Sequence, residues 1–321
     1  MSANDTTLQQ LWPKSGDFEV VAELIRDAQV ESRHWGIAAL VGPDGKVIDE
    51  LGKSKRLIYP RSSIKPLQAV AARRAGLKLS GAHLAITAGS HQGTESHAQL
   101  VTDILDEFDL TTNDLQCPPA WPVYPEDVLK AGEQKRVYFN CSGKHAGFLA
   151  ASKAAGFSTN DYLSPEHPLQ KLIVEVLEEY SGEKVLFTTA DGCGAPLHTI
   201  TVEGLARSIG KFSAEDTDIA AAMLTNAWAV AGKTSADTII LEAGYVAKLG
   251  AEGVFVIGTK SGYGVAVKVA DGALRAAPLV ALGLLHKHQL IETSLYEELF
   301  AKIAQSVTGG SKVTGRLELA N

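Results

Sequence analysis

Patterns typical of β-strands lie near both ends of the 321-residue chain, and mostly helical patterns lie between them. Residues 34–52 (HWGIAALVGPDGKVIDELG) contain two β-rich runs around Pro-Asp-Gly, which predicts a hairpin. Residues 244–272 predict two further antiparallel strands. We therefore expect an α/β (α+β) fold, in which both ends of the chain build an antiparallel sheet and a helical region is inserted between them.

The whole chain, residues 1–321, is expected to form one catalytic domain. Its sheet part is predicted at about 20–76 and 184–305, and its helical part at about 77–183. With 45% hydrophobic residues the chain can bury a large core. Residues 83–93 read as a buried strand running into a loop, 112–140 as irregular and 184–206 as short strands. Apolar spacing predicts helices at 60–76, 95–110, 143–156, 164–182, 214–232, 273–288 and 293–307.

The charge pattern favours a small-molecule partner. The formal net charge is −7 and there is no block of Lys or Arg, which argues against nucleic-acid binding. The N-terminal stretch has no signal-peptide pattern, and the longest apolar run, 277–285, is too short to span a bilayer. We expect a cytoplasmic protein that does not bind membranes and forms a homodimer.

One candidate nucleophile lies in the stretch RSSIKP, at the start of the predicted helix 60–76. Ser62 and Lys65 are three residues apart, so their side chains share one helical face. A lysine can deprotonate a serine only if burial or a neighbouring positive charge lowers its pKa. Because Ser-x-x-Lys is common by chance, a simple helix cap with a solvated lysine is the competing interpretation.

Hydrolases of the Ser-x-x-Lys type add a second hydroxyl and a later Lys-x-Gly on a strand. Here GSHQG supplies Ser90 and His91. Two segments spell Lys-x-Gly, one at Lys248 and one at Lys260. By spelling alone Lys260 is the better match, although TKSGYG also reads as an exposed turn.

The stretch CSGKHAG sets Cys141 three residues before Lys144, and TADGCGAP adds Cys193. It is not a phosphate loop, because it lacks the first Gly and a Ser or Thr after Lys. Buried inert cysteines, a thiol nucleophile and a zinc site with two thiolates all remain open, and a disulfide is less expected. Lys144 would have to lose its proton to bind zinc; His145 and His198 are alternative third donors.

Taken together, RSSIKP, GSHQG, CSGKHAG, DGCGAP and KLGAEGV resemble, in this order, the asparaginase II family, the rhizobial thermolabile type of L-asparaginase. The resemblance covers about residues 20–290. It implies the fold of Ser-x-x-Lys hydrolases such as glutaminases and serine β-lactamases.

The resemblance also assigns roles to residues. Catalytic serine-lysine pairs fall on Ser62 with Lys65 and on Ser90 with Lys248, so that Lys248 is preferred to Lys260. Substrate-binding positions fall on three residues, and zinc ligands on three others, with Ser142 and His145 behind them. The substrate-binding positions are Arg61, His91 and Asp191, and the zinc ligands are Cys141, Lys144 and Cys193.

The function implied is hydrolysis of the side-chain amide of L-asparagine by a serine, most simply Ser62, with Lys65 as general base. The choice between Ser62 and Ser90 stays open at this stage. A glutaminase or another Ser-x-x-Lys amidohydrolase is the alternative enzyme. A zinc-dependent protein that binds a small molecule without turnover is the non-enzymatic alternative.

Overall fold

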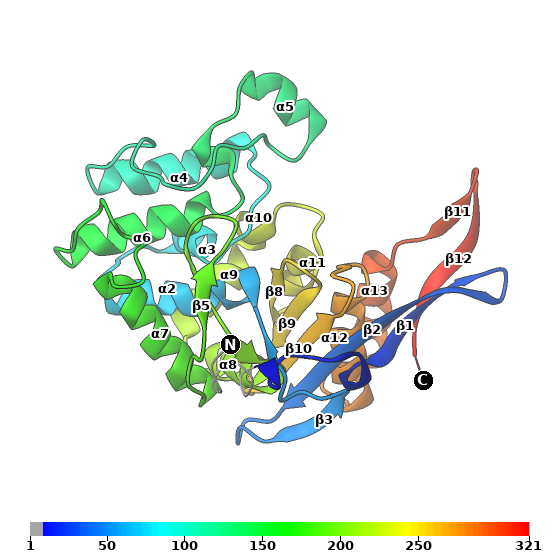
Figure 1. The fold of residues 1–321 in the computed structure, drawn as a ribbon. Coiled ribbons are helices and arrows are strands. Elements are labelled where there is room, and N and C mark those ends of the chain that lie inside the picture. Colours follow the sequence, from blue (N-terminus) through cyan, green and yellow to red (C-terminus); the bar gives the residue numbers. More distant parts are fainter. Residues whose placement is uncertain (1–8, 321) are drawn as a thin grey trace.

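A computed structural model describes residues 9–320 of the chain. Its main sheet has eight strands in the order β11-β12-β1-β2-β10-β9-β8, with β3 paired to β2, and all these pairs are antiparallel. Segments from the two ends of the chain lie side by side, as the blue and red strands of Figure 1 show. The predicted fold class, an antiparallel sheet built from both ends with a helical insertion, is confirmed. The strands are β1 (Glu19–Arg26), β2 (Gln29–Val41), β3 (Val47–Leu51), β8 (Val246–Gly250), β9 (Val254–Gly258), β10 (Gly264–Val269), β11 (Val307–Gly309) and β12 (Lys312–Leu319).

The sheet holds more strands than the sequence pattern indicated. The hairpin β2–β3 is confirmed, but residues 244–272 form three strands instead of two. Strands β1, β11 and β12 were not predicted, and β11 and β12 follow residue 305. Their exposed positions break the apolar pattern, because β12 is mostly exposed or half-buried.

The helical part lies between β4 and β8 in sequence. Helices α2, α3, α6 and α7 pack against one another, and α8 and α12 pack on the sheet. Most helices that the sequence predicted are confirmed. The helices are α2 (Lys65–Arg74), α3 (Gly81–Thr87), α4 (Glu95–Glu107), α5 (Pro125–Ala131), α6 (Ser142–Ala154), α7 (Pro168–Ser181), α8 (Val202–Glu215), α9 (Thr217–Thr225), α10 (Ala227–Ala231), α11 (Ala236–Glu242), α12 (Ala277–Lys287) and α13 (Thr293–Ile303), with the 3₁₀ turns η1 (Ser15–Asp17), η2 (Arg61–Ile64) and η3 (Arg136–Tyr138).

Further secondary-structure predictions were wrong or incomplete, and residues 112–140, expected to be irregular, contain helix α5 and the turn η3. Residues 83–93 begin in helix α3, because a short run that is buried on all sides has no period to separate helix from strand. The short strands predicted at 184–206 are real as β5 (Thr188–Ala190), β6 (Pro196–His198) and β7 (Ile200–Thr201), but helix α8 begins at Val202. Thr201, a residue type favoured in strands, accepts a hydrogen bond from the Gly204 amide as the N-cap of α8. The helix predicted at 214–232 is broken at Asn226 into α9 and α10.

Strand β8 joins the sheet to the helical part. A Cβ atom on Gly250 would lie 2.4 Å from the Pro60 carbonyl oxygen and 3.3 Å from the Ser63 amide nitrogen. Only a glycine therefore lets the end of β8 lie against the turn η2, which follows strand β4 (Leu57–Ile58). This contact brings the Lys-Leu-Gly segment to the predicted serine turn.

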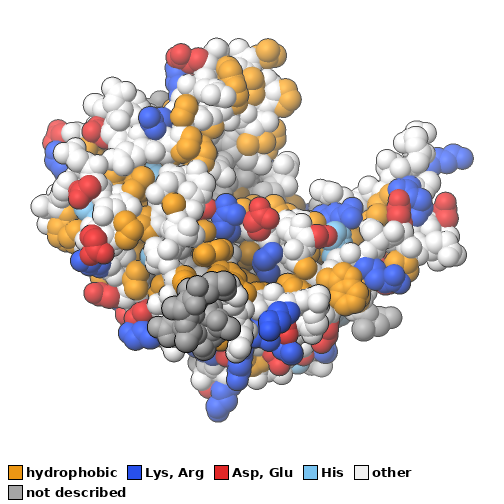
Figure 2. Space-filling view, in the orientation of Figure 1, with side chains coloured by type: hydrophobic (Ala, Val, Ile, Leu, Met, Phe, Trp, Pro, Cys, Tyr) orange, Lys and Arg blue, Asp and Glu red, His pale blue; other side chains and the backbone are white. Residues whose placement is uncertain are grey.

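The surface in Figure 2 carries side chains of both charge signs, interspersed over the face shown. Within residues 9–320, no helix is both long enough and apolar enough to cross a bilayer.

Candidate active site

Ser62 lies on the turn η2, immediately before helix α2. The preceding residue, Arg61, has a φ of 53°, a left-handed conformation that costs energy for a residue with a side chain. The Ser62 hydroxyl is partly exposed and has no hydrogen-bond partner within the described part of the chain. The turn thus presents a free hydroxyl at the start of a helix.

Lys65, one turn further on, is buried. Its amine contacts the Gly89 carbonyl oxygen, the Ser90 hydroxyl at 2.9 Å and the Asn140 carbonyl oxygen at 3.5 Å. Burial lowers the pKa of Lys65 to about 8; the Cys141 sulfur opposes this shift, and the charges of Lys144 and Lys248 assist it. A fraction of the Lys65 amine is therefore neutral near physiological pH, as a general base requires.

Backbone contacts hold Ser90 next to Lys65. The Ser90 amide donates to the Val230 carbonyl oxygen at 2.6 Å, and the next amide, of His91, donates to the Asn140 carbonyl oxygen at 3.1 Å. Helix α10 and the segment before α6 therefore fix the loop that carries Ser90.

The serine-lysine hydrogen bonds in the structure differ from the expected pairs. We expected Lys65 to serve Ser62 and Lys248 to serve Ser90, but Lys65 hydrogen-bonds Ser90. Lys248 instead donates to Asp237 Oδ2 at 3.0 Å and to the Leu249 carbonyl oxygen at 2.9 Å. Lys260, the other Lys-x-Gly candidate, lies exposed in the turn between β9 and β10. Lys248 is buried and Lys260 is exposed, which agrees with the choice of Lys248 as the site lysine. The expected hydrogen bond between Lys248 and Ser90 is not found among residues 9–320.

The three predicted zinc ligands are brought together. Lys144 Nζ lies 3.1 Å from Cys193 Sγ, and Cys141 Sγ donates to Asn140 Oδ1 at 3.3 Å. The neighbouring Cys193 thiol holds the pKa of Cys141 well below its usual value, against the effect of burial, and the charges of Lys65 and Lys144 act in the same direction. The neighbouring Cys141 sulfur and burial raise the pKa of Cys193. Burial would lower the pKa of Lys144, but the two sulfurs outweigh it and raise that pKa.

All cysteines described are free thiols, including Cys117, which is buried elsewhere. Among residues 9–320, no group of three or more His, Cys, Asp and Glu side chains is arranged to hold a metal ion. A metal at the two cysteines would therefore depend on Lys144 as the third donor. Each alternative donor has Nδ1 hydrogen-bonded elsewhere, in His145 to Tyr162 and in His198 to Thr188, while its Nε2 has no hydrogen-bond partner within residues 9–320.

His91, an expected substrate contact, is buried in the described structure. It is 1% exposed and stacks on His97. Its Nδ1 accepts from the Gly93 amide, so its Nε2 carries the proton and donates to Ser142 Oγ at 2.9 Å. Ser142 in turn donates to the Val137 carbonyl oxygen at 2.8 Å. His91 thus anchors the start of helix α6, beside Cys141.

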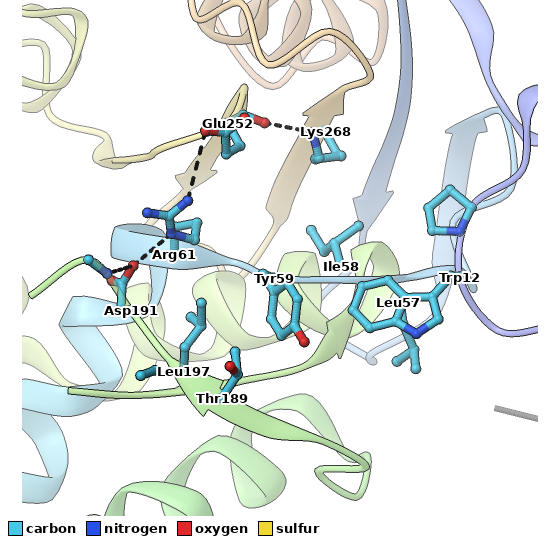
Figure 3. Close-up of a pocket in the computed structure, with 13 residues that line it drawn as sticks. Trp12, Leu57, Ile58, Tyr59, Arg61, Thr189, Asp191, Leu197, Glu252 and Lys268 are labelled. Atoms are coloured by element: carbon cyan, nitrogen blue, oxygen red, sulfur yellow. Dashed lines mark hydrogen bonds and ion pairs between the residues drawn. The ribbon is translucent and has the colours of Figure 1, made fainter. Parts of the chain in front are cut away.

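Arg61 and Asp191, both predicted substrate contacts, are paired with each other. Arg61 Nε lies 2.8 Å from Asp191 Oδ1, and Arg61 Nη1 lies 4.0 Å from Glu252 Oε1. The pair stands at one end of a cavity of about 480 Å³. Figure 3 shows Trp12 and Tyr59 along the cavity and the charged groups of Arg61, Asp191 and Glu252 at its end.

Sequence reasoning missed Asp237, the partner of Lys248. It also missed the main-chain carbonyl groups of Gly89 and Asn140, which accept hydrogen bonds from Lys65. Backbone acceptors have no sequence signal. Asp237 had only a weak one, because an acidic residue in the first turn of a helix is ordinarily a surface feature that favours the helix dipole.

The comparisons with known proteins agree with these motifs. The family model for L-asparaginase II matches residues 22–319, nearly the whole chain. The chain belongs to the L-asparaginase II family. Membership of this family supports an amidohydrolase activity. No curated protein matches the chain.

Three solved structures illustrate weaker similarities. A protein named Mglu, in its native form, is 14% identical with a TM-score of 0.46, over 80% of this chain and 65% of Mglu. A Bacillus glutaminase is 16% identical with a TM-score of 0.44, over 81% of this chain and 91% of that protein. A β-lactamase from Mycobacterium bovis is 16% identical with a TM-score of 0.39, over 79% and 94%. The chain thus spans about two thirds of Mglu, and similarity at this level assigns no residue roles.

Proposed function

We propose that the chain is an L-asparaginase that hydrolyses the side-chain amide of L-asparagine to L-aspartate and ammonia. The observation that carries the proposal is the 2.9 Å contact between the buried amine of Lys65 and the hydroxyl of Ser90. Ser62, whose hydroxyl is free, lies on the turn just before Lys65. Membership of the L-asparaginase II family supports asparagine as the substrate.

Ser62 is the proposed nucleophile, because it lies on the turn one helical turn before Lys65, and Ser90, hydrogen-bonded to Lys65, is placed to relay protons. As the Ser62 oxygen bonds to the amide carbon, its proton passes to the neutral amine of Lys65. Ser90, hydrogen-bonded to Lys65, relays a proton to the amide nitrogen as the carbon–nitrogen bond breaks. Ammonia leaves and an ester forms on Ser62. Lys65 then accepts a proton from water, which hydrolyses the ester to aspartate and restores the Ser62 hydroxyl.

The charged end of the substrate is proposed to bind at Arg61 and Asp191. The Arg61 guanidinium suits the α-carboxylate and the Asp191 carboxylate suits the α-ammonium group. The two side chains hydrogen-bond each other at the wall of the cavity, and Arg61 directly precedes Ser62 in the chain, so substrate would exchange part of that pairing for its own. Their opposite charges fit a zwitterion such as an amino acid.

Zinc remains a proposal. Lys144 contacts Cys193, and Cys141 lies near enough to both to affect their pKa values, so two sulfurs and one amine would fit zinc in donor type and in number. Cys141, Cys193 and Lys144 would hold the ion, and a bound zinc would supply a positive charge that orients substrate. Zinc binding would require Lys144 to lose its proton, against the two sulfurs that raise its pKa.

Ammonia release from asparagine and glutamine, together with hydrolysis of the β-lactam nitrocefin, tests the proposal. We expect the highest kcat/KM for asparagine and a loss of activity in Ser62→Ala. A matched control is Ser208→Ala, a buried helical serine whose hydroxyl bonds only its own helix backbone in the described structure. Preference for glutamine would make the protein a glutaminase, and absence of ammonia from either amide would favour the zinc-dependent binding protein. The predicted homodimer is tested separately by sedimentation.

A further inference from the structure

A buried carboxylate outside the predicted motifs holds one of the site lysines. Asp237, in helix α11, is 1% exposed, and Lys248, on strand β8, is 0% exposed. Asp237 Oδ2 lies 3.0 Å from Lys248 Nζ. Two opposite charges taken completely out of water are costly unless they pair closely, so the contact is a strong constraint on both side chains.

The Asp237 carboxylate serves Lys248 and no other group described. Its second oxygen, Oδ1, has no hydrogen-bond partner within residues 9–320. Helix α11 does not need this carboxylate as a cap, because the Ser235 hydroxyl already accepts from the Thr238 amide at 3.2 Å. A buried carboxylate with one oxygen unmatched lowers stability, which points to a role other than holding the helix.

The Lys248 amine makes two hydrogen bonds. Besides Asp237 it donates to the carbonyl oxygen of Leu249 at 2.9 Å. Two residues further along β8, Gly250 packs against the backbone of Pro60 and Ser63 around the Ser62 turn. Because alternate strand residues face the same side, Lys248 and Gly250 point toward the same part of the molecule.

We propose that Asp237 is a positioning residue of the amide-hydrolysing site, which holds the Lys248 amine at a fixed place beside the Ser62–Lys65 turn. This inference rests on the proposed amidohydrolase function. Asp237 touches neither substrate nor the candidate nucleophile. Its effect on turnover passes entirely through Lys248.

A double-mutant cycle tests this dependence. The variants are Asp237→Asn, Lys248→Met and the combination of both, each measured for kcat and KM with asparagine and for thermal unfolding. We expect Asp237→Asn to lower kcat by at least about tenfold while KM stays within about twofold, because it disturbs a charge that acts in the transition state. In the Lys248→Met background the same change should alter kcat by less than about twofold.

Asp17→Asn is the matched control, because Asp17 is also buried and ion-paired, to Lys53 and Arg56, but is not part of the site. It should lower the unfolding temperature and leave kcat unchanged. If Asp237→Asn does not fold, the double variant, which removes both buried charges, still allows comparison with Lys248→Met.

Equal fold-losses in kcat from Asp237→Asn in the wild-type and Lys248→Met backgrounds would overturn the inference, as would a kcat loss of the same size in Asp17→Asn. A wild-type protein that releases no ammonia from asparagine or glutamine would overturn the proposed function itself. The cycle measured on unfolding temperature would then still report whether the two charges are coupled.

Discussion

Two buried lysines of this site lie in contrasting surroundings. The Lys65 amine contacts two carbonyl oxygens and a serine hydroxyl, and no carboxylate touches it among the residues described. The Lys248 amine is paired with the carboxylate of Asp237. Both side chains are almost completely buried.

The different surroundings suit the two lysines to different roles: Lys65 to proton transfer and Lys248 to a fixed position. Burial without a carboxylate lowers the pKa of Lys65 to about 8, and the positive charge of Lys248 contributes to that shift. The Lys248 amine, in contrast, is held by the Asp237 carboxylate at 3.0 Å. The same residue type therefore serves in one place as a candidate base and in the other as a candidate source of electrostatic stabilisation.

The largest expected effect is that of removing the base. Lys65→Met should lower kcat for asparagine by at least about 1,000-fold, because a nucleophile and its base act as a unit. Steady-state ammonia release measures this, with circular dichroism to verify folding. A folded Lys65→Met protein within tenfold of wild type would remove Lys65 from proton transfer and end the contrast with Lys248.

Removing the Lys248 amine should lower kcat less than removing the Lys65 amine does. Lys248→Met is expected to lower kcat about 100-fold, the usual size for loss of one electrostatic contributor. Lys260→Met, in an exposed turn, should stay within about threefold. Equal losses in these two variants would show that the burial of Lys248 has no bearing on catalysis.

A third lysine, Lys144, differs from Lys65 and Lys248 because its neighbours are sulfur atoms. We predict about one zinc per chain in wild-type protein and less than about a tenth of that in Cys141→Ser and Cys193→Ser, because each thiolate supplies one of three donors. Removing the metal with a chelator should raise KM about tenfold and change kcat less. Elemental analysis and kinetics on the same samples measure both.

Metal content that neither serine substitution changes, or fully active wild type without zinc, would remove the ion from the site. Cys117→Ser is the control, since Cys117 is buried near Arg136 and outside the cluster. It should leave both metal content and KM unchanged.

The smallest expected effect is a pH dependence of folding stability. It tests the rule that burial alone disfavours the charged form of a side chain. Burial lowers the pKa of His198, which lies outside the site, to about 4. Below its ordinary pKa near 6.5 the unfolded chain takes up a proton that the folded chain does not, so stability should fall as pH falls from about 6.5 to 4. The stability difference between wild type and His198→Gln should shrink by on the order of 3 kcal/mol over that range. Urea unfolding at several pH values measures it, and a constant difference would contradict the rule.

The main features of the fold were predictable where the pattern has a clear period. The β2–β3 hairpin and helix α4 have such patterns and were predicted correctly. Helix α3 was not, because a short segment buried on every side has no alternation to interpret. The exposed strands β11 and β12 depend on pairing with β1, a contact between distant parts of the chain that no local pattern reveals.

The sequence predicted which residues lie in the site better than it predicted which of them contact one another. The motifs gathered Lys65, Ser90 and the two cysteines correctly into one region. They did not predict that Lys65 would bond Ser90 or that Lys248 would bond Asp237. Such partners depend on how α3, α10 and α11 pack around the lysines, which motif spacing does not encode.

The proposed mechanism requires one serine to be the nucleophile while Lys65 takes its proton. The direct measurement is covalent labelling with 5-diazo-4-oxo-L-norvaline, a diazoketone analogue of asparagine, followed by peptide mass spectrometry. We predict label on Ser62 in the wild type and in Lys260→Met, and none in Lys65→Met. Label on Ser90 or on a cysteine, or undiminished labelling of Ser62 without Lys65, would contradict the account.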